Sequence, residues 1–310
     1  MKIVFFGTPE FAVPALKSLL GSKHEVLAVV TQPDRQSGRG RKMKFCPVKI
    51  EALNADIRVL QPQTVKDPAF VGEMKNLNPA VIVVVAYGQI LPPGLIHLPQ
   101  KGCINIHASL LPHYRGAAPI NWSLIHGDRS TGITIMQMDE GMDTGPILLQ
   151  EELEILPDDT AVSLSERLSD AGGPLLITAL DGLENDRLKP YPQEGIATYA
   201  AIMKKSDGFI QWARTADELN AFIRGMNPWP GAYGFIEHER YKILNAVPVD
   251  GTGEPGVITK MTKEEFQVGT GSGLLSVLEI QPAGKPSMSV HAFLQGSRLK
   301  EGMRFSLNDD

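Results

Sequence analysis

Three polar residues, Asn105, His107 and Ser109, are spaced two apart in a segment that is otherwise typical of a β-strand. Successive side chains of a strand alternate between its faces, so all three are expected on one face. Strands of buried parallel sheets are usually apolar on both faces, so an amide beside an imidazole needs a specific explanation. A solvated edge or a hydrogen-bonded core histidine is the alternative, and it is the commoner fate of an isolated histidine.

An acidic loop with two glycines lies further along the chain and contains Asp139, Glu140 and Asp143. The loop and the strand together supply a base, a carboxylate that can orient it and a neutral amide donor, which are the groups that acyl transfer requires. This combination favours an acyl-transfer site. The residues alone do not rank the three carboxylates, and each of them could equally lie in a surface turn.

The composition indicates a globular protein of more than one domain. A chain of 310 residues exceeds the size at which single hydrophobic cores usually stop growing. The net charge of −5 argues against general coating of nucleic acid but not against a local basic patch. Cys46 and Cys103 form no metal-binding motif, and no signal peptide or membrane-spanning run is recognisable, so we expect a cytoplasmic protein without a metal.

Alternating strand-like and helix-like segments up to about residue 185 predict a parallel α/β sheet. The expected strands cover residues 3–6, 25–31, 58–60, 80–86, 103–107, 132–138 and 147–153. A segment rich in proline follows, and then short β-prone pieces between glycine-rich turns, which suit a small antiparallel barrel. We therefore expect a catalytic domain over residues 1–187, a linker over 188–205 and a β-barrel domain over 206–310.

Two further stretches have open interpretations. Gly7 follows the first strand without the other glycines of a dinucleotide-binding fingerprint, so a tight turn is favoured over a nicotinamide site. Tyr87 follows an apolar strand whose carboxyl end should face a ligand crevice, although a packed aromatic is as good an interpretation.

The densest charge run of the chain covers residues 34–44 and holds five basic residues against one acidic residue, a net charge of +4. A solvated loop and a phosphate-binding element explain this run equally well.

These motifs resemble those of the folate-dependent formyltransferase superfamily. The resemblance rests on Asn105-Ile-His107, the turn Ser109-Leu-Leu-Pro112 with Gly116 after it, and Asp143 between glycines. It covers nearly the whole chain. It is strongest to the members that formylate methionyl-initiator tRNA, through the basic insertion that begins at Gln32, the stretch 83–88 and Asn227-Pro-Trp-Pro230.

The resemblance implies a Rossmann-like catalytic domain, and after it an OB-like barrel that binds tRNA. It implies transfer of the formyl group of 10-formyltetrahydrofolate to the α-amine of methionyl-initiator tRNA, by a monomer that uses no metal. The implied catalytic residues are Asn105, His107 and Asp143; the implied folate contacts are Ser109, Leu110, Leu111, Pro112, Tyr87 and Gly88; the implied tRNA contacts are Arg35, Arg39, Arg41 and Lys42.

Three alternative functions share some of these features. A formyltransferase acting on a nucleotide-sugar amine would share the same core, but it has little use for the basic run at residues 34–44. A hydrolase that releases formate from the folate usually carries large additional domains. A non-catalytic RNA-binding module leaves the Asn105, His107 and Asp143 set unexplained. The bases read in the tRNA and the recognition of the methionyl side chain stay open.

Overall fold

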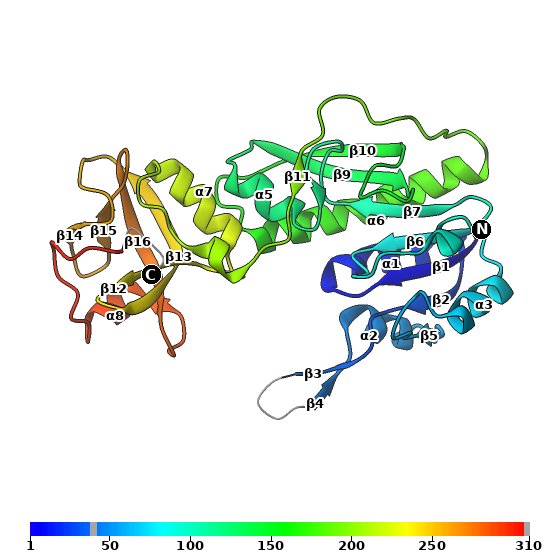
Figure 1. The fold of residues 1–310 in the computed structure, drawn as a ribbon, viewed down its shortest axis with the longest axis horizontal. Coiled ribbons are helices and arrows are strands. Elements are labelled where there is room, and N and C mark those ends of the chain that lie inside the picture. Colours follow the sequence, from blue (N-terminus) through cyan, green and yellow to red (C-terminus); the bar gives the residue numbers. More distant parts are fainter. Residues whose placement is uncertain (38–41, 307–310) are drawn as a thin grey trace. The chain divides into compact units, whose positions relative to one another are not determined.

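The computed structural model describes residues 1–37 and 42–306, which form two compact units (Figure 1). The N-terminal unit comprises residues 1–116, 130–154 and 165–199. The C-terminal unit comprises residues 117–129 and 155–164 and the described part of 200–310. Two excursions of the chain, at 117–129 and 155–164, thus belong to the C-terminal unit although they lie early in the sequence.

A seven-stranded sheet forms the centre of the N-terminal unit, in the order β10-β9-β7-β6-β1-β2-β5. Its strands are β1 (Lys2–Gly7), β2 (Glu25–Val30), β5 (Val59–Leu60), β6 (Val81–Val85), β7 (Cys103–His107), β9 (Ser130–Gln137) and β10 (Ile147–Glu154). The first five of these pair in parallel, so the α/β class with a mostly parallel sheet is confirmed.

The predicted parallel pairing does not extend to β9 and β10. Strand β9 pairs antiparallel with both β7 and β10. The connection from β9 to β10 covers residues 138–146, which is shorter than the dozen or more residues that a parallel crossover requires.

Helices cover both faces of this sheet: α1 (Val13–Leu20), α2 (Pro47–Asn54), α3 (Pro68–Leu77), α4 (Pro93–Ile96) and α6 (Ala161–Glu184), with a 3-10 turn η1 (Glu10–Ala12) before α1. On one face Phe6 and Val84 share a buried cluster with Phe70 and Met74 of α3. On the other face α6 lies against the sheet at Gly172, where a Cβ would come within 3.3 Å of Ile106 Cγ2. Strand β6 has the sequence VIVVV and is fully buried, as expected for β-branched residues in a central strand.

The order of the strands reverses beside β1, because the chain runs from β1 to β2 and β5 and then crosses to β6 and β7. Ligands of open α/β sheets bind outside the carboxyl ends of the strands at such a reversal. The ends of β1 and β6 meet there, and Thr8 Oγ1 donates a hydrogen bond of 3.0 Å to the Tyr87 carbonyl. At Gly7 an added Cβ would lie 2.7 Å from the Phe5 ring and 2.9 Å from Ala12, so the tight-turn interpretation explains this glycine.

A small antiparallel hairpin, β3 (Arg35–Ser37) and β4 (Lys42–Lys44), projects from the N-terminal unit (Figure 1). The sequence predicted a loop here. Its base is fixed by Lys49, whose Nζ lies 2.5 Å from Asp34 Oδ2 and 4.0 Å from the centre of the Phe45 ring. Gln61 donates to Asp34 Oδ1 over 3.0 Å, so the residues that flank the hairpin on both sides are held.

The C-terminal unit contains an antiparallel sheet with the strand order β12-β13-β16-β15-β14, and β17 pairs with β16. Its elements are α5 (Pro119–Ile125), η2 (Lys205–Gly208), α7 (Ala216–Met226), β12 (Ala232–Ile236), β13 (Glu239–Val249), β14 (Ile258–Met261), β15 (Phe266–Gly269), β16 (Leu274–Pro282), β17 (Met288–Ser289) and α8 (Val290–Leu294). Trp212, Phe266 and Phe305 are buried in its core. The antiparallel sheet is confirmed, and the OB-like barrel stays a prediction.

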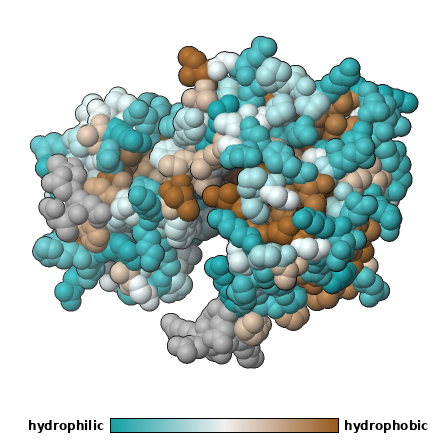
Figure 2. Space-filling model, turned by 45° about the vertical axis from the view of Figure 1, so that its right-hand side comes forward, coloured by the Kyte–Doolittle hydropathy of each residue, from teal (hydrophilic) through white to brown (hydrophobic). Residues whose placement is uncertain are grey.

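Apolar side chains also reach the surface, where Figure 2 shows brown areas among the teal. In the N-terminal unit Ile196 and Ile90 are the most exposed of these, at 84% and 81%. Among the described residues, no helix combines the length and the apolar character that crossing a membrane requires.

Candidate active site

The site begins at the carboxyl end of β7, where Asn105 and His107 lie two residues apart on one face of the strand. Asn105 is half-buried, and its side-chain amide forms no hydrogen bond with any residue the structure describes. His107 is 6% exposed, and its Nε2 lies 2.9 Å from the Tyr114 carbonyl oxygen. A carbonyl only accepts, so Nε2 carries a proton and Nδ1 is the nitrogen left for other chemistry.

Asp143 supplies the carboxylate that faces this histidine, with Oδ2 at 3.7 Å from His107 Nδ1. The same oxygen accepts a hydrogen bond of 2.8 Å from the Gly116 N–H. The side chain is 19% exposed, so the carboxylate is shielded but reachable. Its backbone is left-handed, with φ of 53°.

The geometry separates the three carboxylates that the sequence left unranked. Asp139 accepts hydrogen bonds from the Gly141 N–H and the Thr144 hydroxyl, so it supports the turn of its own loop. Glu140 pairs with exposed His97 at 3.2 Å. Asp143 is therefore the carboxylate of this loop that lies beside His107.

The turn after β7 is held from beneath by Thr134 of β9, whose side chain is fully buried. Thr134 Oγ1 donates to the Ser109 carbonyl at 2.6 Å and accepts from the Leu111 N–H at 3.1 Å and from Gln150 Nε2 at 2.9 Å. Ser109 is also buried, and its hydroxyl donates to the His113 carbonyl at 2.6 Å. Leu111 and Pro112 are buried and Leu110 is half-buried, so the turn presents mainly backbone.

Tyr87 is 2% exposed, and its ring packs edge-on against Phe6 with the centres 5.1 Å apart. Burial raises the pKa of its hydroxyl to about 12, so the group is neutral at physiological pH. The packed-aromatic interpretation therefore describes the side chain, and the backbone carbonyl of residue 87 accepts hydrogen bonds from Thr8 Oγ1 and Gln32 Nε2. Gly88 is exposed, with φ of 93°.

The predicted tRNA contacts are only partly described. Arg35 begins β3 and its side chain is exposed. Lys42 begins β4. Arg39 and Arg41 lie outside the described residues.

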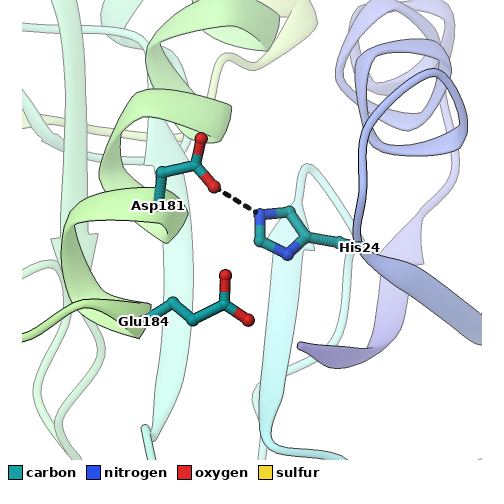
Figure 3. Close-up of side chains that lie close together, drawn as sticks. All are labelled: His24, Asp181 and Glu184. Atoms are coloured by element: carbon teal, nitrogen blue, oxygen red, sulfur yellow. Dashed lines mark ion pairs between the residues drawn. The ribbon is translucent and has the colours of Figure 1, made fainter.

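Within residues 1–37 and 42–306, His24, Asp181 and Glu184 are the single group of His, Cys, Asp or Glu side chains close enough to share a metal ion (Figure 3). Two ammonium groups already neutralise its carboxylates. Lys23 Nζ lies 2.9 Å from Asp181 and 3.0 Å from Glu184, and the Met1 α-ammonium lies 2.9 Å from Glu184.

The Met1 ammonium also donates to His24 Nδ1 at 3.0 Å, so the proton of the neutral ring is on Nε2, which points at Asp181 over 3.3 Å. Burial and the neighbouring Met1 ammonium lower the pKa of His24 and keep the ring neutral. These ion pairs account for both carboxylates of the cluster.

Two residues around the site carry no sequence signal. Gln193 and Thr198 lie in the segment predicted to be a linker, yet Gln193 donates to the carbonyls of Asp143 and Gly145, and Thr198 Oγ1 accepts from the Tyr114 N–H at 2.8 Å. Their contacts are to backbone groups, which leave no recognisable spacing in the sequence.

Comparison with known proteins places these observations in a family. Residues 1–180 match the family described as formyl transferase, and residues 202–298 match its C-terminal domain. The chain is 48% identical over 301 residues to a methionyl-tRNA formyltransferase of Thermodesulfovibrio yellowstonii, covering 97% of both chains. It is 49% identical over 306 residues to one of Caldanaerobacter subterraneus, covering 97% of this chain and 99% of that one.

Among solved structures, a sugar 3N-formyl transferase with dTDP and 5-N-formyl-THF is similar in fold, with a TM-score of 0.69 at 20% identity. It is matched over 92% of this chain and 99% of that one. HypX from Aquifex aeolicus in complex with tetrahydrofolic acid gives a TM-score of 0.64 at 16% identity, over 96% of this chain and 47% of that one.

Proposed function

The chain belongs to the formyl transferase family, and we propose that it transfers the formyl group of 10-formyltetrahydrofolate to the α-amine of methionyl-initiator tRNA. The acceptor is supported by the 48–49% identity, over almost the full length, to relatives named methionyl-tRNA formyltransferase. The sugar formyl transferase is 20% identical, so its likeness concerns the fold alone.

The reaction exchanges one C–N bond for another. The neutral α-amine attacks the formyl carbon, and a tetrahedral oxyanion forms. The bond from that carbon to N10 then breaks, N10 takes up a proton, and the amine nitrogen loses one. The enzyme must therefore stabilise an oxyanion and move a proton from the amine to N10.

Asn105 is suited to the first task, because its half-buried amide has no competing hydrogen bond within the described residues. A preorganised neutral donor at an oxyanion typically lowers the barrier by about 3–4 kcal/mol. The second task falls to His107 and Asp143. Because His107 Nε2 is bonded to the Tyr114 carbonyl, the ring acts through Nδ1 as the base for the amine proton, and the Asp143 carboxylate 3.7 Å away stabilises the positive charge that the ring then carries.

The folate co-substrate is proposed to lie along the turn Ser109–Pro112 and the backbone of residues 87–88. Thr134 fixes the turn, so its backbone groups are preorganised for a ligand. Tyr87 contributes its main chain, because its ring is buried.

The basic hairpin is proposed to contact the acceptor stem of the tRNA through Arg35, Arg39, Arg41 and Lys42. Its support is the local charge of +4 in a chain of net charge −5. We further propose that residues 1–187 form the catalytic domain and that residues 206–310, after a linker, form an OB-like, tRNA-binding domain. The enzyme is proposed to act as a monomer in the cytoplasm and to need no metal.

The decisive experiment offers the purified enzyme 10-formyltetrahydrofolate with methionyl-initiator tRNA, methionyl-elongator tRNA or a 4-amino sugar nucleotide. Formylation of the initiator tRNA alone is expected, with Asn105→Ala as the inactive control. Formylation of the sugar, or release of formate without an acceptor, would overturn the proposed substrate.

A further inference from the structure

A glutamine in the segment between the two matched family domains completes a ring of hydrogen bonds around the site. Gln193 is half-buried, and its Nε2 donates to the carbonyls of Asp143 and Gly145, at 2.8 Å each. Its Oε1 accepts from Arg115 Nε at 3.1 Å and from Arg115 Nη2 at 2.6 Å. Both N–H groups and both lone pairs of one side-chain amide are therefore used.

Arg115 stands between the two residues that hold the catalytic pair. On one side, the Tyr114 carbonyl accepts from His107 Nε2 at 2.9 Å. On the other side, the Gly116 N–H donates to Asp143 Oδ2 at 2.8 Å. Gln193 thus links the loop that carries the carboxylate to the segment that orients the imidazole.

The loop needs such support, because Asp143 has a left-handed backbone with φ of 53°, a conformation that residues other than glycine rarely adopt. The two bonds from Gln193 fall on the carbonyl of Asp143 itself and on that of Gly145, two residues on. They hold the loop at the strained residue, where a small change in backbone angle would move the carboxylate away from His107.

We propose that Gln193 is a positioning residue, which sets the separation of Asp143 and His107 without touching either substrate. This inference rests on the proposed function of the Asp143–His107 pair. The side chain has to be a primary amide. A glutamate could keep the bond to Arg115 with one oxygen, but its second oxygen would face two carbonyl oxygens and could not donate to them. A methionine of similar length would form neither set of bonds.

The test measures formyl transfer by the full-length enzyme carrying Gln193→Met or Gln193→Glu, with Glu194→Gln at the exposed neighbouring position as the control. We expect Gln193→Met to lower kcat by about ten- to a hundredfold, since misplacing a reacting group by about 1 Å can cost a factor of about 100. KM for both substrates should change little, and Glu194→Gln should match the wild type. If Gln193→Met does not fold, Gln193→Glu, which keeps the Arg115 contact, provides the measurement.

A double-mutant cycle separates positioning from general support. In an Asp143→Asn background, Gln193→Met should lower kcat little further, because the group that it positions is already lost. Equal losses in both backgrounds, or a wild-type kcat for both Gln193 variants, would overturn the inference. A wild-type kcat for Asp143→Asn would instead overturn the catalytic assignment in the proposed function, so the two failures are distinguishable.

Discussion

Replacing Asp143 by asparagine should isolate the contribution of its charge. The asparagine side-chain oxygen can still accept the hydrogen bond from the Gly116 N–H, so the loop should keep its conformation. The negative charge 3.7 Å from His107 Nδ1 is lost. The His107 ring becomes positively charged when Nδ1 takes up the amine proton. At an effective dielectric constant of about 20, a carboxylate at that distance stabilises this positive charge by about 4.5 kcal/mol.

This energy sets the expected size of the defect. Because a tenfold change in rate corresponds to about 1.4 kcal/mol, complete loss of the interaction would lower kcat by about three orders of magnitude. Asp143 is partly exposed, and screening by water reduces the interaction, so we expect a fall of about 10²- to 10³-fold. This range lies within that of general acid–base catalysis, about 10²- to 10⁴-fold.

The assay is single-turnover and steady-state formyl transfer at saturating 10-formyltetrahydrofolate and methionyl-tRNA. Glu140→Gln is the matched control, because it removes a carboxylate from the same loop that pairs with exposed His97 instead of His107. The control should keep wild-type kcat, and both variants should unfold at the wild-type temperature. A kcat near wild type for Asp143→Asn, or an equal loss in Glu140→Gln, would refute the reasoning.

Three further predictions concern other parts of the molecule. Arg39→Ala combined with Arg41→Ala should raise KM for methionyl-tRNA and leave KM for folate unchanged. The negative slope of log(kcat/KM) against log[salt] should become less steep by about 1 for each phosphate that the enzyme no longer neutralises. An unaltered slope in kinetics at several salt concentrations would contradict a role in tRNA binding. Thr134→Val removes a buried hydroxyl that is hydrogen-bonded to the Leu111 N–H, the Ser109 carbonyl and the Gln150 side-chain amide. The free energy of unfolding in urea titrations should therefore fall by about 2–4 kcal/mol. Unchanged stability would show that the turn is held by other contacts. The Met1 α-ammonium and Lys23 lower the pKa of Glu184 from 4.5 to about 2. The ionised carboxylate therefore stabilises the fold fully above pH 4.5, and this contribution is lost as the pH falls toward 2. Glu184→Gln should be less stable than the wild type at pH 7, and thermal unfolding measured against pH should show the difference disappear over that acid range.

The sequence was sufficient for the parts of the fold in which local pattern and burial agree. The strand Cys103–His107 was predicted with its observed bounds, because the apolar residues on one face and polar residues on the other follow its period of two. The antiparallel pairing of β10 with β9 could be predicted, because residues 138–146 are too few for a parallel crossover. The direction of β9 relative to β7 could not, since β9 is buried over most of its length and its apolar pattern does not report direction.

The sequence likewise indicated some residues of the candidate site and not others. Asn105 and His107 stand out because polar residues on a buried strand are unusual, whereas Gln193 lies among two prolines and a glycine that are typical of a linker. The choice of Asp143 over Asp139 and Glu140 needed either the family resemblance or the distances, because all three carboxylates have the same chemistry and share one loop. The burial of Tyr87 depends on Phe6, which is distant in sequence, and no local pattern reports it.

The segment that leaves the catalytic unit also decides where the chain can be divided. The family match ends at residue 180, yet Tyr191 exchanges backbone hydrogen bonds of 2.8 and 2.9 Å with Ile147, and Thr198 bonds the Tyr114 N–H. A fragment cut at the family boundary would lack these bonds and those of the Gln193 side chain, and it would expose the edge of β10 at Ile147. A separately expressed N-terminal fragment should therefore extend at least to Tyr199, and it would still carry residues 117–129 and 155–164, which belong to the C-terminal unit.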